Sequence, residues 1–152
     1  MTARTATTDV ETLSIPGNTF KVLEDGESTA GRIGVVECEL DPGWAGPPQH
    51  THRQHDETFY VLEGTVRFHA GDESFVLTAG QSTTIPLGTP HTFENASDAE
   101  RARLLGTVSP ARYIKYFREL SALPANPEGR LDAASIGRLM DEYDTEPYAG
   151  RS

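Results

Sequence analysis

Short apolar runs fill the chain from Thr12 to Val108, and Gly, Pro, Asn and Asp separate one run from the next. The helix period is absent throughout this region, so the runs predict strands. Many short strands at this spacing indicate an antiparallel barrel or jelly roll. The strands are expected at Thr19–Leu23, Arg32–Leu40, Thr58–Leu62, Thr65–Ala70, Glu73–Leu77, Gln81–Ile85, His91–Glu94 and Arg103–Val108.

The hydrophobic period changes after Pro110, where apolar residues begin to recur at helical spacing. The stripes are Tyr113, Tyr116, Phe117 and Leu120 in a first helix, and Ile136, Leu139, Met140 and Tyr143 in a second. A proline-containing linker, residues 121–129, ends the first helix, and Asp132 is placed to cap the second. The helices are too short to form a domain, so we expect them to pack on the barrel or on a second subunit. Packing on the outside of a sheet is favoured over covering of a barrel mouth.

At 152 residues the chain has the size of one domain with one core. The expected fold is therefore all-β, a single jelly-roll barrel over residues 12–109 with a short α-helical extension over residues 110–146. Residues 1–11 are rich in Thr and poor in apolar side chains, so we expect a mobile N-terminus.

The formal net charge is −10, and no run of Lys or Arg occurs in the chain. Nucleic acid and anionic membranes are therefore not expected as partners. No apolar run has the length of a membrane span, and the N-terminus lacks the apolar region of a signal peptide. The single cysteine, Cys38, excludes an internal disulfide and fits a reducing compartment, so a cytoplasmic location is expected.

Four side chains with metal-binding chemistry occur in two stretches of the barrel region. His50 and His52 are two positions apart, so on a strand both imidazoles point to the same face. Glu57 follows on the next apolar segment, and His91 lies in the later stretch. Three imidazoles and one carboxylate suit a divalent first-row transition metal, and they leave positions of an octahedral ion open for substrate or oxygen.

These stretches resemble the two signature motifs of the cupin superfamily. The first motif is met by His50, His52, Glu57 and Gly64, and the second by Gly80, Pro86, Gly88, His91 and Asn95. The interval between the motifs, residues 65–79, has 15 residues and fits one hairpin. One departure occurs at Trp44, where the family has a glycine, and the flanking Gly43 and Gly46 can supply the same turn. The resemblance implies a cupin barrel, a double-stranded β-helix, whose metal ligands are His50, His52, Glu57 and His91.

Alternation along the strands that carry Glu57 and His91 places further side chains beside the ligands. The predicted substrate pocket consists of Trp44, Phe59, Val61, Phe93 and Asn95. His55 and Asp56 fall in the turn between the ligand strands and are interpreted as rim residues. A contact of His55 with substrate, or a hydrogen bond from it to a ligand, is the alternative. His69 is interpreted as a histidine outside the site.

The spacing of His50, His52 and Glu57, the chain length and the aromatic tail are similar to those of small single-domain cupins of the quercetin dioxygenase type. That resemblance implies an aromatic or poly-oxo substrate that binds the metal through a phenolic or enolic oxygen, loses its proton to Glu57 and reacts with O2. The metal is then iron, nickel, cobalt or manganese. Burial in an apolar site is expected to raise the pKa of Glu57, which favours a catalytic base near neutral pH. In the alternative, Glu57 stays off the metal and serves only as the base.

Two other functions stay open. Similar single-domain cupins act as cyclases or isomerases of poly-oxo compounds such as aromatic polyketides, where zinc suffices and no oxygen is consumed. The other is a non-catalytic, small-molecule-binding cupin whose metal is only structural. Sugar nucleotide epimerisation is disfavoured, because the arginines are dispersed and form no cluster for a pyrophosphate. The fold and the ligands do not decide among these reactions.

The resemblance also implies an assembly. Cupins commonly dimerise by strand exchange at a sheet edge, so a homodimer is expected. The apolar segment Thr12–Leu23, next to the N-terminus, is the candidate for the exchanged strands.

Overall fold

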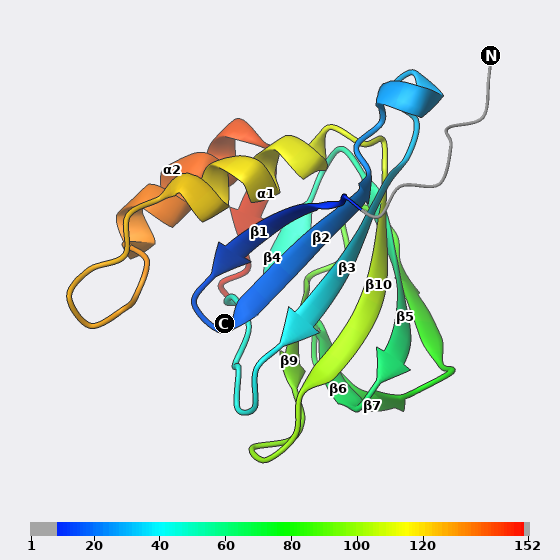
Figure 1. The fold of residues 1–152 in the computed structure, drawn as a ribbon, viewed down its shortest axis with the longest axis vertical. Helices are drawn as coiled ribbons and strands as arrows, with labels where there is room; N and C mark the ends of the chain where they lie inside the picture. The colour runs from blue at the N-terminus through cyan, green and yellow to red at the C-terminus, as the bar shows by residue number, and fades with distance from the viewer. Residues whose placement is uncertain (1–8, 151–152) are drawn as a thin grey trace.

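In the computed structural model, which describes residues 9–150, eleven strands form two sheets that face each other across an apolar interior (Figure 1). Neighbouring strands pair antiparallel. The first sheet consists, in spatial order, of β1 (Glu11–Ile15), β2 (Asn18–Glu24), β3 (Gly34–Leu40), β10 (Ala102–Ser109), β5 (Asp56–Glu63) and β8 (Ser82–Ile85). The second consists of β11 (Thr145–Pro147), β4 (His50–His52), β9 (His91–Asn95), β6 (Thr65–Ala70) and β7 (Glu73–Thr78). The expected jelly-roll class is confirmed.

Side-chain alternation separates the inner and outer faces of the sheets. On β3 the side chains of Val36, Cys38 and Leu40 are buried, and they join one core with residues of β5, β6 and β10. Glu37, between them, faces outward and accepts a hydrogen bond from Nε of Arg103 on β10 at 3.0 Å. Arg103 is therefore a surface charge paired with a carboxylate of the neighbouring strand.

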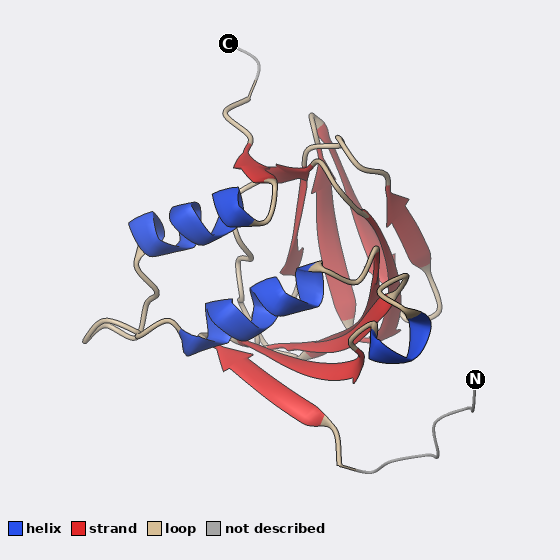
Figure 2. Ribbon diagram, turned by 90° about the horizontal axis from the view of Figure 1, so that it is seen from above, coloured by secondary structure: helices blue, strands red, loops and turns tan. Residues whose placement is uncertain are grey.

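Two helices follow β10 and lie together on one side of the barrel. α1 (Tyr113–Ala122) contacts β1, α2 (Ala133–Glu142) contacts β11, and the helices contact each other. Figure 2 shows them between these two strands, across the opening between the sheets. Asp132 caps α2 as predicted, because its carboxylate accepts a hydrogen bond from the amide of Ser135 at 2.8 Å. Within residues 9–150, neither these helices nor the 3₁₀ turn Glu27–Thr29 has the length and apolar character needed to cross a membrane.

The tail differs from expectation in two ways. Its apolar stripes do not pack on the outside of a sheet, because side chains of both helices line the cavity between the sheets. The open side of the barrel presents apolar surface there, and the helices cover it. The chain then returns as β11, which pairs with β4 in the register Thr145↔His52 and Pro147↔His50. A strand of three residues carries too little alternation to be predicted from sequence.

The predicted mobile segment, residues 1–11, falls mostly outside the described residues, but Glu11 already begins β1. The segment Thr12–Leu23 forms the β1–β2 hairpin within its own chain, and β2 continues the ladder onto β3. β1 is an edge strand of the first sheet. A homodimer formed by strand exchange stays a prediction.

Candidate metal centre

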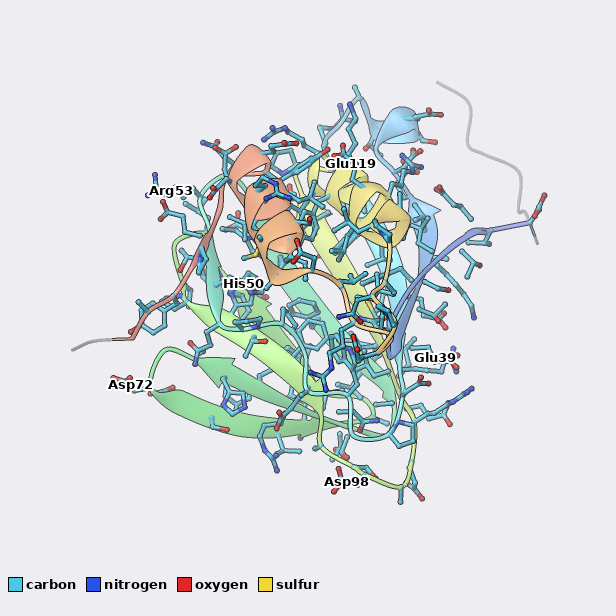
Figure 3. All side chains as sticks on the ribbon, turned by 90° about the vertical axis from the view of Figure 1, so that its left-hand side faces the viewer. Glu39, His50, Arg53, Asp72, Asp98 and Glu119 are labelled. Carbon is cyan, nitrogen blue, oxygen red and sulfur yellow. The ribbon has the colours of Figure 1, made fainter. Side chains whose placement is uncertain are left out.

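Three histidines and a glutamate from both sheets converge between the sheets. β4 places His50 and His52 on one buried face, and His50 is the register partner of His91 at the start of β9. The potential ligand atoms of these histidines lie within 4.8 Å of one another. Glu57 reaches the group from β5 in the opposite sheet, with its Oε2 2.9 Å from Nε2 of His91 and 3.4 Å from Nε2 of His52. The structure therefore brings together all four predicted ligands, and Figure 3 shows His50 inside the fold.

Two of the imidazoles are oriented by backbone carbonyls. Nδ1 of His50 donates to the carbonyl of Pro48, and Nδ1 of His91 donates to the carbonyl of Thr89, both at 2.9 Å. A carbonyl oxygen only accepts, so the proton is placed on Nδ1 and the second ring nitrogen turns toward the cluster. This is the arrangement of metal-binding histidines.

The third imidazole, His52, is oriented by the last strand of the chain. Its Nδ1 lies 2.9 Å from the hydroxyl oxygen of Thr145, a fully buried residue of β11. That hydroxyl lies 3.3 Å from the carbonyl of Tyr143, so it can donate there while it accepts from His52. Sequence reasoning missed Thr145, because it lies 93 residues from His52 and no motif marks it.

The surroundings of Glu57 decide its charge. Burial alone raises the pKa of this carboxyl, but favourable interactions with the imidazoles of His52, His55 and His91 outweigh burial and hold the pKa well below its usual 4.5. The expected rise of the pKa was therefore wrong, because imidazoles rather than purely apolar groups surround the carboxylate. Glu57 is an anion at neutral pH, which is the state that a metal ligand requires.

The histidines differ in their affinity for a proton. Burial, helped by the neighbouring imidazoles, lowers the pKa of His50 to about 3, and burial also lowers the pKa of His52. Both rings are therefore neutral ligands at neutral pH. Burial acts in the same direction on His91, but its hydrogen bond to Glu57 outweighs burial and raises the pKa above 6.5. The proton shared by His91 and Glu57 competes with a metal for the same atoms.

His55 belongs to this cluster, although its turn position suggested a rim residue. It is only 4% exposed, and its Nε2 lies 3.4 Å from Oε1 of Glu57. Its ring packs against the rings of both His52 and Tyr113, at centroid distances of 4.0 and 4.3 Å. The rim interpretation was wrong for His55, because Tyr113 of α1 covers the turn. Asp56 is exposed, as expected.

The cluster has the composition and the unmet hydrogen bonding of a metal centre. Nε2 of His52 and Nε2 of His55 are buried and have no hydrogen-bond partner among residues 9–150. A buried polar atom without a partner costs about 1–3 kcal/mol, and a cation beside these nitrogens removes that cost. Neutral imidazoles with one carboxylate suit iron, nickel, cobalt, manganese or zinc. The residues therefore fit one divalent transition metal, with the predicted ligand set His50, His52, Glu57 and His91.

A cavity of about 320 Å³ lies beside the cluster and is lined by both sheets and both helices. Of the predicted pocket residues, Trp44, Phe59 and Phe93 line it. The ring centroid of Phe93 lies 5.6 Å from that of Trp44 and 5.1 Å from that of Phe59, so the three form one aromatic wall. The helical tail adds aromatic side chains that were not predicted to line the pocket: Tyr113, Tyr116 and Phe117.

Val61 and Asn95 do not belong to the cavity lining. Val61 is fully buried in the core. The side-chain nitrogen of Asn95 donates to the carbonyls of Leu40, Asp41 and Glu100, so the side chain ties two loops together. The pocket prediction was wrong for both, because alternation identifies the face of a strand but not the depth at which a side chain lies.

Trp44 reaches the cavity because its loop lies directly on β9. Gly46 has a φ of 72°, and a Cβ on it would lie 2.0 Å from the carbonyl oxygen of Phe93. The close approach allows the carbonyl of Trp44 to accept a hydrogen bond from the amide of Asn95 at 3.0 Å. The indole ring then packs on Gly17, where a Cβ would lie 2.3 Å from the ring.

Residues 36–108 match the family model of the cupin domain. The chain is a small cupin. It is 27% identical over 100 residues to quercetin 2,3-dioxygenase of Bacillus subtilis, a match that covers 66% of this chain and 29% of that protein. It is 37% identical over 62 residues to polyketide synthase CurC of Streptomyces cyaneus, which covers 41% of this chain and 40% of that protein. An RmlC-like cupin from Shewanella frigidimarina superposes with a TM-score of 0.61 at 26% identity, covering 73% of this chain and 93% of that one.

The replacement His91→Ala is expected to reduce bound metal from about one ion per chain to almost none, while the barrel still folds on its apolar core. Elemental analysis measures the metal, and circular dichroism measures the fold. His69→Ala is the matched control, because Nε2 of His69 lies 3.8 Å from Glu94 and away from the cluster. Full metal content in the His91 variant would contradict the assignment, as would an unfolded variant that keeps its metal.

The replacement Thr145→Val removes the hydroxyl that orients His52 while it keeps the shape of the side chain. Metal affinity is expected to fall about 10- to 100-fold, because the imidazole is no longer held in its binding orientation. Competition with a chelator of known affinity measures the change. Thr51→Val is the control, since Thr51 lies between the two histidines of β4 but alternates away from them. Equal affinities in the two variants would rule out a role for Thr145.

Proposed function

We propose that this cupin is a metal-dependent dioxygenase of the quercetin dioxygenase kind, acting on an aromatic compound with a phenolic or enolic oxygen. The observation that carries the proposal is the placement of the His/Glu cluster beside a largely apolar cavity with aromatic side chains in its wall. The volume of about 320 Å³ is in the range of small-molecule sites. The similarity to the Bacillus subtilis enzyme supports the same reaction class.

Different parts of the cavity have different roles in the proposed reaction. Phe59 and Phe93 hold an aromatic ring by stacking, and the helices that cover the cavity exclude water. A divalent transition metal bound by the cluster supplies positive charge that lowers the pKa of a phenol or enol and, if redox-active, gives access to reaction with O2.

Glu57 accepts the proton of the substrate. Its Oε2 faces the nitrogens of His52 and His91, whereas its Oε1 faces only His55, so Oε1 is the atom assigned to the proton. A carboxylate with a lowered pKa is a weak base, so it takes a proton only from a hydroxyl that has become acidic. Nε2 of His55 lies 3.4 Å from Oε1, so its imidazole flanks the carboxylate at the atom assigned to the proton.

A second candidate is supported by the similarity to polyketide synthase CurC. In this proposal the same cavity binds a poly-oxo aromatic compound, and Glu57 removes a proton to start a cyclisation or isomerisation. The reaction consumes no oxygen, and zinc suffices as the metal.

Elemental content and oxygen uptake distinguish the two candidates. The protein is purified without added metal and then given a flavonol and a small panel of phenolic poly-oxo compounds. Stoichiometric iron, nickel, cobalt or manganese with substrate-dependent oxygen uptake is the expected result. Zinc with conversion of a compound but no oxygen uptake would support the cyclase or isomerase. Absence of metal after reconstitution would contradict both and leave a binding role.

The replacement Glu57→Gln keeps the size of the side chain but removes its negative charge and its basicity. Turnover is expected to fall about 10²- to 10⁴-fold, while an appreciable part of the metal stays bound by the three histidines. Steady-state rates normalised to metal content measure the effect. Glu94→Gln is the control, because Glu94 lies on β9 like His91 but outside the cluster. Unchanged turnover per metal ion in the Glu57 variant would remove this residue from the mechanism.

A further inference from the structure

One amide side chain outside the metal cluster lines the same cavity. Asn18 begins β2 and shares its inward face with Phe20 and Val22, as the alternating burial of this strand shows. It is 3% exposed, and it lines the cavity together with Glu57 of the metal cluster.

The amide of Asn18 has an unmet hydrogen bond. Its Oδ1 is buried and has no partner within the part of the chain that the structure describes, residues 9–150. The neighbouring lining residues Ile15, Pro16 and Phe20 have no side-chain donor, and the indole N–H of Trp44, which packs on Gly17, does not hydrogen-bond Oδ1. A buried carbonyl oxygen without a donor lowers stability, and a leucine of similar size would avoid that cost. Packing alone does not explain an amide at this position, whereas a ligand that donates a hydrogen bond to Oδ1 does.

Asn18 and Glu57 stand at opposite ends of the first sheet. Asn18 is the register partner of Leu40 on β3. Glu57 pairs with Val108, which in turn pairs with Gly34 on β3. Asn18 is thus level with position 40 of β3, and Glu57 is level with position 34. Six residues of strand separate these positions, which corresponds to about 20 Å along the strand direction. Side chains reach inward from both levels and shorten the span, but a ligand that contacts both ends is elongated.

We infer that Asn18 is a specificity residue that recognises a hydroxyl group at the end of the ligand remote from the metal. The inference rests on the proposed function, in which the other end of the ligand carries the metal-binding oxygen. The ligand class is therefore an elongated, largely apolar aromatic compound with a hydroxyl donor at its far end. An analogue without this hydroxyl leaves Oδ1 unpartnered and binds more weakly.

Fluorescence of Trp44 gives a direct test. It is the single tryptophan of the chain, it lines the cavity, and its ring packs on Gly17 beside Asn18. The purified protein is titrated under argon with two flavonols, one with hydroxyl groups on the pendant ring and one without them. The wild type is expected to bind the hydroxylated compound about tenfold more tightly. In Asn18→Leu the affinity for the hydroxylated compound should fall to that for the other.

Two further variants serve as controls for the effect of Asn18→Leu. Phe20→Leu reduces apolar contact two residues along the same face, so it should weaken both compounds alike. Asn18→Ala repeats the test with a smaller side chain in case Leu is not accommodated. The unliganded Asn18→Leu protein should melt no lower than the wild type, because an unpaired buried amide has been removed. A lower melting temperature of Asn18→Leu, together with an unchanged preference for the hydroxylated flavonol in Asn18→Ala, would show a structural role for Asn18 and overturn the inference.

The titration involves no turnover, so it is independent of the test of the reaction. A protein that contains zinc and takes up no oxygen would contradict the proposed dioxygenase activity. The difference in affinity for the two flavonols could still depend on Asn18 in that case. Equal affinity of the wild type for the two flavonols, or preference for the hydroxylated one retained in both Asn18 variants, would overturn the role of Asn18 whatever the reaction. Failure of both flavonols to bind the wild type would overturn the ligand class.

Discussion

The candidate metal centre depends on the burial of a carboxylate among imidazoles. An unpaired charge in an apolar interior is strongly unfavourable, so the anion of Glu57 is tolerated only beside a proton or a cation. The proton held near His91 balances this charge, whereas the rings of His50 and His52 stay neutral. Because Glu57 and His91 lie on opposite sheets, their hydrogen bond links the two sheets.

The helical tail has two roles at this centre. α1 and α2 cover the open side of the barrel, which turns an apolar groove into a cavity that can hold a small aromatic molecule. Tyr113 of α1 also packs on His55, and β11 supplies the hydroxyl beside His52. Electrostatic interactions strengthen where water is excluded, so the same segment that shapes the cavity also strengthens the chemistry of the cluster.

Local patterns were sufficient to predict much of this molecule from its sequence. Alternation located strands such as β3 and β10, and the spacing of His50, His52, Glu57 and His91 identified a group that the structure brings together. What failed depends on how side chains meet in the assembled barrel. The pKa of Glu57 is set by His52 and His55, which are near it in the sequence, together with His91, 34 positions away.

The missed residues follow the same rule. Thr145 acts on a histidine 93 positions away. Asn95 and Val61 face inward but lie outside the cavity lining, and the depth of a side chain is a property of the assembled barrel. The cover formed by the two helices likewise could not be read from their apolar stripes, which fit an outer surface and a cavity equally well.

The pairing of β11 with β4 has a consequence for the order in which the molecule is completed. β11 follows both helices, so it can pair with β4 only when the tail has crossed the open side of the barrel. Until it has paired, the ring of His52 lacks its hydroxyl partner. Completion of the centre and closure of the cavity are therefore coupled, because both depend on the docking of the same segment.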